Sequence, residues 1–314
     1  MPGRITLTWD DGPTCPVPIK ILALASKWNT DGVEFYWNGA TMLRQEIRDR
    51  LGIVPFTTKY QADVPHLRDG RPLDWLDWLD RERGSRDRRD VALQLLDPAV
   101  LDMCRGMGRY IDPSRLCDLI GYHGMTHEQS DSLAHPISLG SEDFAQEFCF
   151  FETLVQAAFD APIFRLRKGR TPYGSGMSFD VEMPPMQQEA YPAMLERSRQ
   201  ARPDFVWNAW EVNVLDYENK GVFDEAAAIR YALSLARRPG RQQARILLHE
   251  RYYKGESGTL ERLFEQLARQ DEDPARDEGR SSSDHTGESR GPGNRWPIAK
   301  LTQLLLQAKS RLTR

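Results

Sequence analysis

Residues 4–13 read RITLTWDDGP, and this stretch begins the fold. Its apolar side chains alternate with threonines, which is the two-residue period of a β-strand, and the Gly12-Pro13 pair ends the strand. Asp10 and Asp11 stand side by side at that end. Two neighbouring carboxylates repel each other, and a cation between or beside them removes this cost. The segment predicts a strand that ends in two carboxylates, with a bound cation or a capped tight turn as the two explanations.

This strand is one of several short apolar runs that stop at glycine or at polar residues. The others lie at 33–37, 119–120, 205–207 and 246–248. Apolar residues at steps of three and four appear between them, at 144–155 and 224–233. Strands that alternate with helices predict an α/β protein with a largely parallel sheet, either open or closed into a barrel.

The composition is typical of a soluble globular protein, with 40% hydrophobic and 28% charged residues among 314. Lys and Arg number 42 against 46 Asp and Glu, so nucleic acid is not an expected partner. No run approaches the roughly 18 apolar residues of a membrane-spanning helix. The N-terminus lacks a basic start followed by an apolar region, and the four cysteines form no C-x-x-C pair. We therefore expect a cytoplasmic protein in a reducing compartment.

The C-terminal part differs in composition from the rest. Residues 269–294 contain a single apolar side chain, Ala275, and are predicted to be a disordered linker. Residues 295–314 place apolar side chains on one face of a helix and basic residues on the others. We expect this amphipathic helix to dock on its own domain or on a second subunit, as in a homo-oligomer, in preference to peripheral contact with an anionic membrane. The functional domain is predicted to span 1–268.

His123 and His127 form the first candidate metal-binding pair. Residues four apart share one face of a helical turn, so both imidazoles could hold one ion. The alternative is two partly buried histidines that form hydrogen bonds near the end of a strand. One aspartate and two histidines would make a three-ligand divalent site that leaves positions open for water and substrate.

Five motifs, in the same order along the chain, resemble those of the polysaccharide deacetylases of the NodB-homology group, carbohydrate esterase family four. They are T-W-D-D-G-P at 8–13, H-G-M-T-H at 123–127, R-T-P-Y-G at 170–174, W-E-V-N-V-L-D-Y at 210–217 and L-L-H at 247–249. The resemblance covers residues 4 to about 265, apart from a charge-rich segment at about 57–116 that looks like an insertion. It implies a distorted (β/α) barrel with its site at the carboxyl ends of the strands, to which this sequence adds a helical or loop insertion and a C-terminal helix.

The resemblance also implies a divalent metal ion held by Asp11, His123 and His127. Asp10 would be the general base that takes a proton from the attacking water, and Arg170 would hold Asp10 in place. Zinc is the expected ion, and the same ligand set suits cobalt, nickel or manganese.

The remaining catalytic roles follow from the same resemblance. His249 would protonate the departing amine, and Asp216 would keep His249 protonated by charge pairing. The backbone N–H of Tyr173 would stabilise the tetrahedral oxyanion. The alternatives are a surface ion pair for Arg170 and a turn residue for Asp216.

Three positions depart from the family's motifs. Gly124 stands where the family has Ser or Thr, Asn213 replaces an aspartate, and Tyr217 replaces a tryptophan. None of the three is a predicted ligand, base or acid, so we expect an active enzyme.

The insertion contains a possible helical stripe of apolar residues after Asp74. Its members are Trp75, Leu76, Trp78 and Leu79. We favour packing of these tryptophans on the barrel over the alternative, a lid that contacts the sugar.

Together these features predict a metal-dependent N-deacetylase that hydrolyses the acetamido group of an amino sugar, glycoside or oligosaccharide. Two alternatives stay open. One is the hydrolysis of another non-peptide C–N bond on the same site, such as a formamide or ureide. The other is a catalytically weak protein that binds carbohydrate or a partner.

Overall fold

The computed structural model describes residues 4–30, 32–51, 75–125, 141–172, 185–218, 220–240, 243–255 and 258–272. His127, Tyr173 and the predicted helix at 295–314 lie outside these ranges and stay predictions. Of the predicted linker at 269–294, residues 269–272 belong to a helix that ends at Glu272, and the remainder lies outside the described residues.

Seven strands form one parallel sheet in the order β5-β4-β3-β2-β1-β7-β6. Their bounds are β1 (Arg4–Gly12), β2 (Val33–Trp37), β3 (Ile120–Tyr122), β4 (Lys168–Gly169), β5 (Val206–Trp207), β6 (Val212–Asn213) and β7 (Gln243–His249). The five strands expected from the sequence are all present, and β4 and β6 are additional.

The sheet curls because its two edge strands are neighbours in the sequence. Chain from Trp207 in β5 to Val212 in β6 reaches at most about 18 Å when fully extended. A flat sheet of this strand number would separate its edges by about 29 Å. No pairing joins β5 to β6 among the described residues. The sheet is therefore a barrel left open along one side, which confirms the predicted α/β class and distorted barrel.

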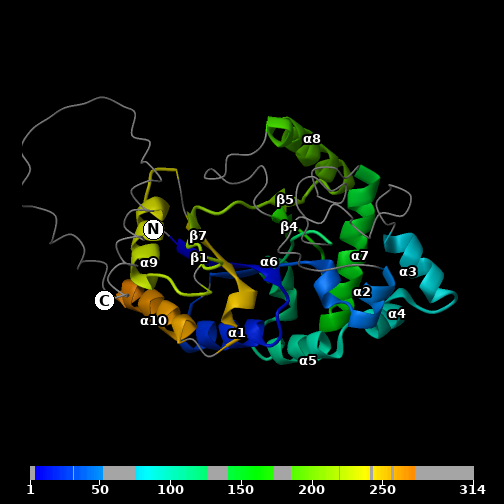
Figure 1. Cartoon of the computed structure of the whole chain (residues 1–314), viewed down its shortest axis with the longest axis horizontal. Coiled ribbons are helices and arrows are strands. Elements are labelled where there is room, and N and C mark those ends of the chain that lie inside the picture. The colour runs from blue at the N-terminus through cyan, green and yellow to red at the C-terminus, as the bar shows by residue number, and fades with distance from the viewer. Residues whose placement is uncertain are drawn as a thin grey trace, which may run out of the picture. The chain divides into compact units, whose positions relative to one another are not determined.

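Helices connect the successive strands other than β5 and β6 and pack on the outside of the sheet. The α-helices of the described residues are α1 (Val17–Lys27), α2 (Gln45–Leu51), α3 (Trp75–Arg83), α4 (Arg88–Leu95), α5 (Pro98–Met107), α6 (Leu116–Leu119), α7 (Ser141–Phe159), α8 (Pro185–Ala201), α9 (Glu225–Ala236) and α10 (Thr259–Glu272). Contacts run in a row from α9 through α10, α1, α5 and α7 to α8 (Figure 1). None of the described helices is both long and apolar enough to span a bilayer.

Strand β1 lies inside the sheet, between β2 and β7. Leu7 and Trp9 are fully buried on one of its faces, and Thr8 is fully buried on the other. A parallel strand covered on both faces cannot leave a buried polar group unpaired. The Thr8 hydroxyl accordingly donates to the Ile246 carbonyl at 2.9 Å. The last residues of β1 therefore lie at the barrel mouth with a strand on either side.

Part of the predicted insertion forms helices α3, α4 and α5, between β2 and β3. All three contact α7. Trp78 of α3 is 6% exposed, and its ring meets that of Phe150 in α7 edge-on at 6.0 Å. Trp78 thus packs against the barrel helices, as the favoured interpretation expected. The side chain of Trp75 lies outside the described residues.

Candidate active site

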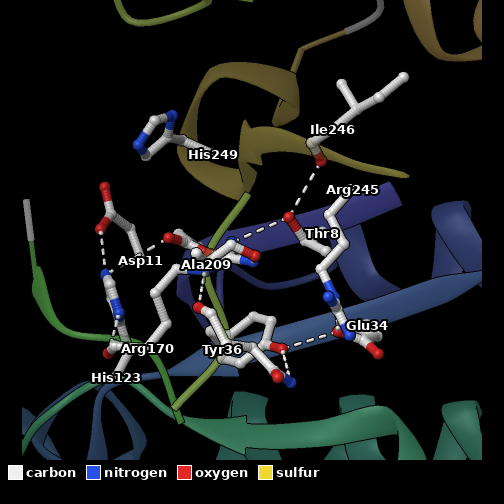
Figure 2. Close-up of polar contacts among 12 residues, drawn as sticks. Thr8, Asp11, Glu34, Tyr36, His123, Arg170, Ala209, Arg245, Ile246 and His249 are labelled. Atoms are coloured by element: carbon white, nitrogen blue, oxygen red, sulfur yellow. Dashed lines mark hydrogen bonds and ion pairs between the residues drawn. The ribbon is translucent and has the colours of Figure 1, made fainter. Parts of the chain in front are cut away.

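The predicted functional side chains come from neighbouring strands that end at the same edge of the sheet. Asp10 and Asp11 lie near the carboxyl end of β1, His123 follows β3, Arg170 follows β4, and His249 ends β7. Asp10 is the direct register partner of His249. Because all strands are parallel, their carboxyl ends meet, and Figure 2 shows Asp11, His123, Arg170 and His249 gathered there.

A tight turn directs both carboxylates of β1 to this mouth. Consecutive residues of a strand normally point to opposite faces. Asp11 breaks that alternation with a φ of 66°, in the left-handed region that aspartate tolerates better than most residues. A Cβ on Gly12 would lie 2.1 Å from Glu250 Oε1 and 2.4 Å from Trp37 Cδ1, so position 12 has no room for a side chain.

Asp10 is held by a fully buried arginine. One terminal nitrogen (NH1) of Arg170 donates to Asp10 Oδ1 at 2.7 Å and to Thr8 Oγ1 at 2.8 Å. Nε of Arg170 donates to the Asn208 carbonyl at 3.1 Å, and its other terminal nitrogen donates to the Ala209 carbonyl at 3.5 Å. A guanidinium fixed on several sides sets the position of the carboxylate it pairs with.

The hydrogen bonds of His123 determine which of its nitrogens faces the carboxylates unprotonated. Nδ1 lies 2.8 Å from the Arg170 carbonyl, which can only accept, so Nδ1 carries the proton. Nε2 faces Asp11 Oδ1 at 3.5 Å and Asp10 Oδ2 at 3.7 Å, and in the neutral imidazole it presents a lone pair to them. A lone pair and two carboxylates in a buried site need a shared cation or an added proton.

The donor set therefore suits a divalent metal ion. A metal-ligating histidine commonly donates its other ring N–H to a backbone carbonyl, as His123 does here. Two ligand atoms of one tetrahedral zinc stand about 3.4 Å apart, close to the 3.5 Å between Asp11 Oδ1 and His123 Nε2. Among the described residues no three His, Cys, Asp or Glu gather closely enough to hold an ion, and the predicted third ligand, His127, is not among them.

Arg251 is a residue of this site that the sequence interpretation missed. Its Nε lies 3.4 Å from Asp11 Oδ2. Each of the two carboxylates thus turns one oxygen to His123 and the other to an arginine, Arg170 for Asp10 and Arg251 for Asp11. The two arginines offset the repulsion that adjacent aspartates would otherwise carry into the folded state.

Glu250 is a second residue that the sequence interpretation missed. It is fully buried beneath the turn and accepts from Trp37 Nε1 at 2.8 Å and from the Thr14 backbone N–H at 2.7 Å. Burial raises the pKa of this carboxyl to about 8, the charges of Asp11 and Asp10 add to the rise, and the two hydrogen bonds oppose it. Glu250 therefore supports the turn through its contacts with Trp37 and Thr14.

His249 is paired with the fully buried Asp216. Nδ1 of the imidazole lies 2.7 Å from Asp216 Oδ1, and the His249 backbone N–H donates to Asp216 Oδ2 at 2.8 Å. Burial lowers the pKa of His249, but the Asp216 hydrogen bond and the charges of Asp11, Asp216 and Asp10 outweigh it and raise the pKa to about 9. The imidazole is therefore protonated at neutral pH and can act as an acid.

This pairing predicts the alkaline limit of activity. We expect kcat/KM to fall on the alkaline side, where His249 loses its proton; a pH of about 9 is the upper bound of this midpoint, because a divalent ion at Asp11 opposes the charges of Asp11 and Asp10 that raise the pKa. Asp216→Asn removes the charge that favours the protonated imidazole, so the midpoint should move toward the ordinary value of 6.5. Rate profiles of both chains between neutral and strongly alkaline pH measure this shift. An identical alkaline midpoint in Asp216→Asn would show that another group limits the rate.

The three departures from the family motifs have local explanations in the structure. Gly124 has a φ of 87°, which favours glycine over serine or threonine. The Asn213 side-chain oxygen accepts from the Leu215 backbone N–H at 3.0 Å and so stabilises its own loop. Tyr217 is 41% exposed and meets the His249 ring edge-on at 5.7 Å. None of them displaces the predicted site residues.

Comparisons with known proteins return structures with a similar fold. A scan against models of protein families gives no match, and a search of curated proteins gives none. A polysaccharide deacetylase from Bacillus cereus is 15% identical over 94% of this chain and 98% of its own, with a TM-score of 0.42. A family 4 carbohydrate esterase from Streptomyces lividans is 16% identical over 85% of this chain and 86% of its own, with a TM-score of 0.41. A CE4 family pseudoenzyme from Bacillus anthracis is 13% identical over 87% of this chain and 62% of its own, with a TM-score of 0.39.

The structure places six predicted site residues at one end of the barrel. They are Asp10, Asp11, His123, Arg170, Asp216 and His249. His127 and Tyr173 lie outside the described residues. The individual roles of all eight stay predictions that the experiments below test.

Proposed function

We propose that this chain is a metal-dependent N-deacetylase that hydrolyses the acetamido group of an amino sugar. The observation that carries the proposal is a carboxylate, Asp10, held by the buried Arg170 beside Nε2 of His123 and the carboxylate of Asp11. The choice of an acetamido sugar follows from the five sequence motifs and from the protonated His249 at the same mouth.

Asp11 and His123 would hold the ion, together with His127 as the sequence predicts. A divalent metal bound there lowers the pKa of a water molecule and polarises the amide carbonyl. Asp10 would take a proton from the attacking water as the water oxygen bonds to the acyl carbon. Arg170 would hold the Asp10 side chain in position for this transfer through its hydrogen bond to Oδ1.

His249 completes the reaction on the leaving-group side. The C–N bond of the tetrahedral species breaks only if the nitrogen is protonated, because an amide anion is too poor a leaving group. His249 supplies that proton from Nε2, because Nδ1 is paired with Asp216. The products are acetate and the free amino sugar. Asp10 then releases its proton to solvent, and His249 regains one from solvent.

A combined metal and turnover measurement tests the proposal. We expect about one divalent ion per purified chain by elemental analysis, and acetate release from N-acetylated mono- and oligosaccharides. A chelator should abolish turnover, and added zinc or cobalt should restore it. Turnover confined to N-formyl or ureido compounds would assign another C–N bond as the substrate. Full metal loading without turnover of any acylated amine would favour a carbohydrate-binding protein.

A further inference from the structure

The guanidinium that holds Asp10 lies against two aromatic rings. Cζ of Arg170 is 4.2 Å from the ring centre of Tyr36 and 5.3 Å from that of Trp210. Cations are attracted to aromatic faces, and the attraction grows when water is excluded. Arg170 and Tyr36 are both fully buried. The Tyr36 ring therefore fixes one side of the arginine, and the hydrogen bonds to Asp10 and its neighbours fix the rest.

The Tyr36 ring reaches Arg170 across strand β3, which lies between β2 and β4. Its register partner on β3 is Gly121. A Cβ on Gly121 would lie 2.8 Å from both Cδ1 and Cε1 of the tyrosine ring. The ring thus occupies the space of a missing side chain on β3, and the glycine allows it to extend to the arginine.

The tyrosine hydroxyl completes a closed network of hydrogen bonds with Asn208 and Arg170. It donates to Glu34 Oε2 at 2.7 Å and accepts from Asn208 Nδ2 at 2.9 Å. The carbonyl of the same asparagine accepts from Arg170 Nε at 3.1 Å. Tyr36, Asn208 and Arg170 therefore hold one another, and none of them can shift alone.

Glu34 anchors this hydrogen-bond network deeper in the barrel. Its Oε1 lies 3.1 Å from Lys168 Nζ, and its Oε2 lies 3.6 Å from Arg245 Nε. Burial raises the pKa of Glu34, but the lysine, the Tyr36 hydroxyl and the arginine outweigh it and lower the pKa, so the carboxylate is ionised. Figure 2 shows Glu34 between Arg245 and Tyr36.

We propose that Tyr36 is a positioning residue for the hydrolysis reaction: its ring supports the Arg170 guanidinium, and its hydroxyl, fixed by Glu34 and Asn208, sets where Arg170 holds the base Asp10. The proposal rests on the function stated above. A displacement of about 1 Å in a reacting group can cost a hundredfold in rate. Tyr36 touches neither Asp11 nor His123 in any contact given by the structure, so its effect should be on the rate and not on metal loading.

Kinetics of Tyr36→Leu and Tyr36→Phe test this role on an acetylated substrate that the wild type hydrolyses. Leucine removes the ring, so we expect kcat to fall roughly 10- to 100-fold, while KM changes by less than about twofold and metal content is unchanged. Phenylalanine keeps the ring and loses only the hydroxyl, so it should lower kcat by only about three- to tenfold.

Phe35→Leu is the matched control. Phe35 is the preceding residue of the same strand, is fully buried, and points to the opposite face. It should lower the melting temperature in the same way as Tyr36→Leu but leave kcat within about twofold of the wild type. An equal loss of kcat in both variants would show that strand stability, and not positioning, explains the effect.

A double-mutant cycle with Asp10→Asn separates positioning from packing. Without the base there is nothing left to position, so Tyr36→Leu should cost no further rate in that background, while its stability loss persists. Equal rate losses in both backgrounds would overturn the proposal, and so would wild-type kcat in Tyr36→Leu.

Should Tyr36→Leu fail to fold, unchanged kcat in Tyr36→Phe would overturn it. A wild type that hydrolyses no acetamide refutes the function itself, and the proposal with it.

Discussion

Replacement of Asp10 by asparagine is expected to lower kcat by roughly 10²- to 10⁴-fold. The amide keeps the size of the side chain and can accept the Arg170 hydrogen bond through its oxygen, but it cannot take up a proton at neutral pH. Steady-state acetate release, measured with the metal content of each preparation, gives the effect. The loss should appear in kcat and kcat/KM alike, because the base acts only in the transition state.

Metal content provides the internal control for this variant. Asp10 Oδ2 is farther from His123 Nε2 than Asp11 Oδ1 is, at 3.7 Å against 3.5 Å, and the sequence assigns the ligand role to Asp11. Asp11→Asn should therefore lose metal and activity together, while Asp10→Asn loses activity with metal retained. An Asp10→Asn chain that keeps a tenth or more of the wild-type kcat would place the general base elsewhere.

Arg170→Leu is expected to lower the free energy of unfolding by about 3–5 kcal/mol. Arg170 is fully buried and Asp10 is 3% exposed, so removal of the guanidinium leaves a buried carboxylate without its counterion. Asp11 stands beside it, and the two charges then repel at full strength. Urea unfolding of chelator-treated protein, followed by far-UV circular dichroism, measures the change without interference from bound metal.

The double variant Arg170→Leu/Asp10→Asn distinguishes charge from packing. Neutralising the carboxylate removes the penalty of an unpaired buried charge, so the double variant should be more stable than Arg170→Leu alone. Arg170→Lys should lose less stability than Arg170→Leu, since it keeps a positive charge but cannot donate in four directions at once. Equal stability of the single and double variants would mean that Asp10 is not charged in the folded chain.

The sequence predicted five of the seven strands, including the short β3 and β5, and missed only β4 and β6. Strands β1, β2 and β7 are five residues or longer, and β3 and β5 coincide with short apolar runs, so their pattern is visible. Strands β4 and β6 contain two residues each, Lys168–Gly169 and Val212–Asn213. No periodicity exists over two residues, so only the pairing with neighbouring strands defines them.

The convergence of the site was predictable for a different reason. Carboxyl ends of parallel strands meet at one edge, so residues that follow strands, such as Asp11 and His123, come together whatever their separation in sequence. Tyr36, Glu34 and Arg251 could not be found in this way. Their roles depend on which side chains face the barrel interior and how far they reach, and an ionised glutamate inside an apolar strand gives no local signal of its partner.

The arginine behind each carboxylate has a consequence for how the protein matures. In small zinc domains the ion must arrive before the chain can fold, because nothing else neutralises the ligands. Here Arg170 and Arg251 already balance Asp10 and Asp11. We expect the newly made polypeptide to fold completely without metal and to bind the proposed ion afterwards. Retention of the near-UV circular dichroism spectrum after chelation would demonstrate this.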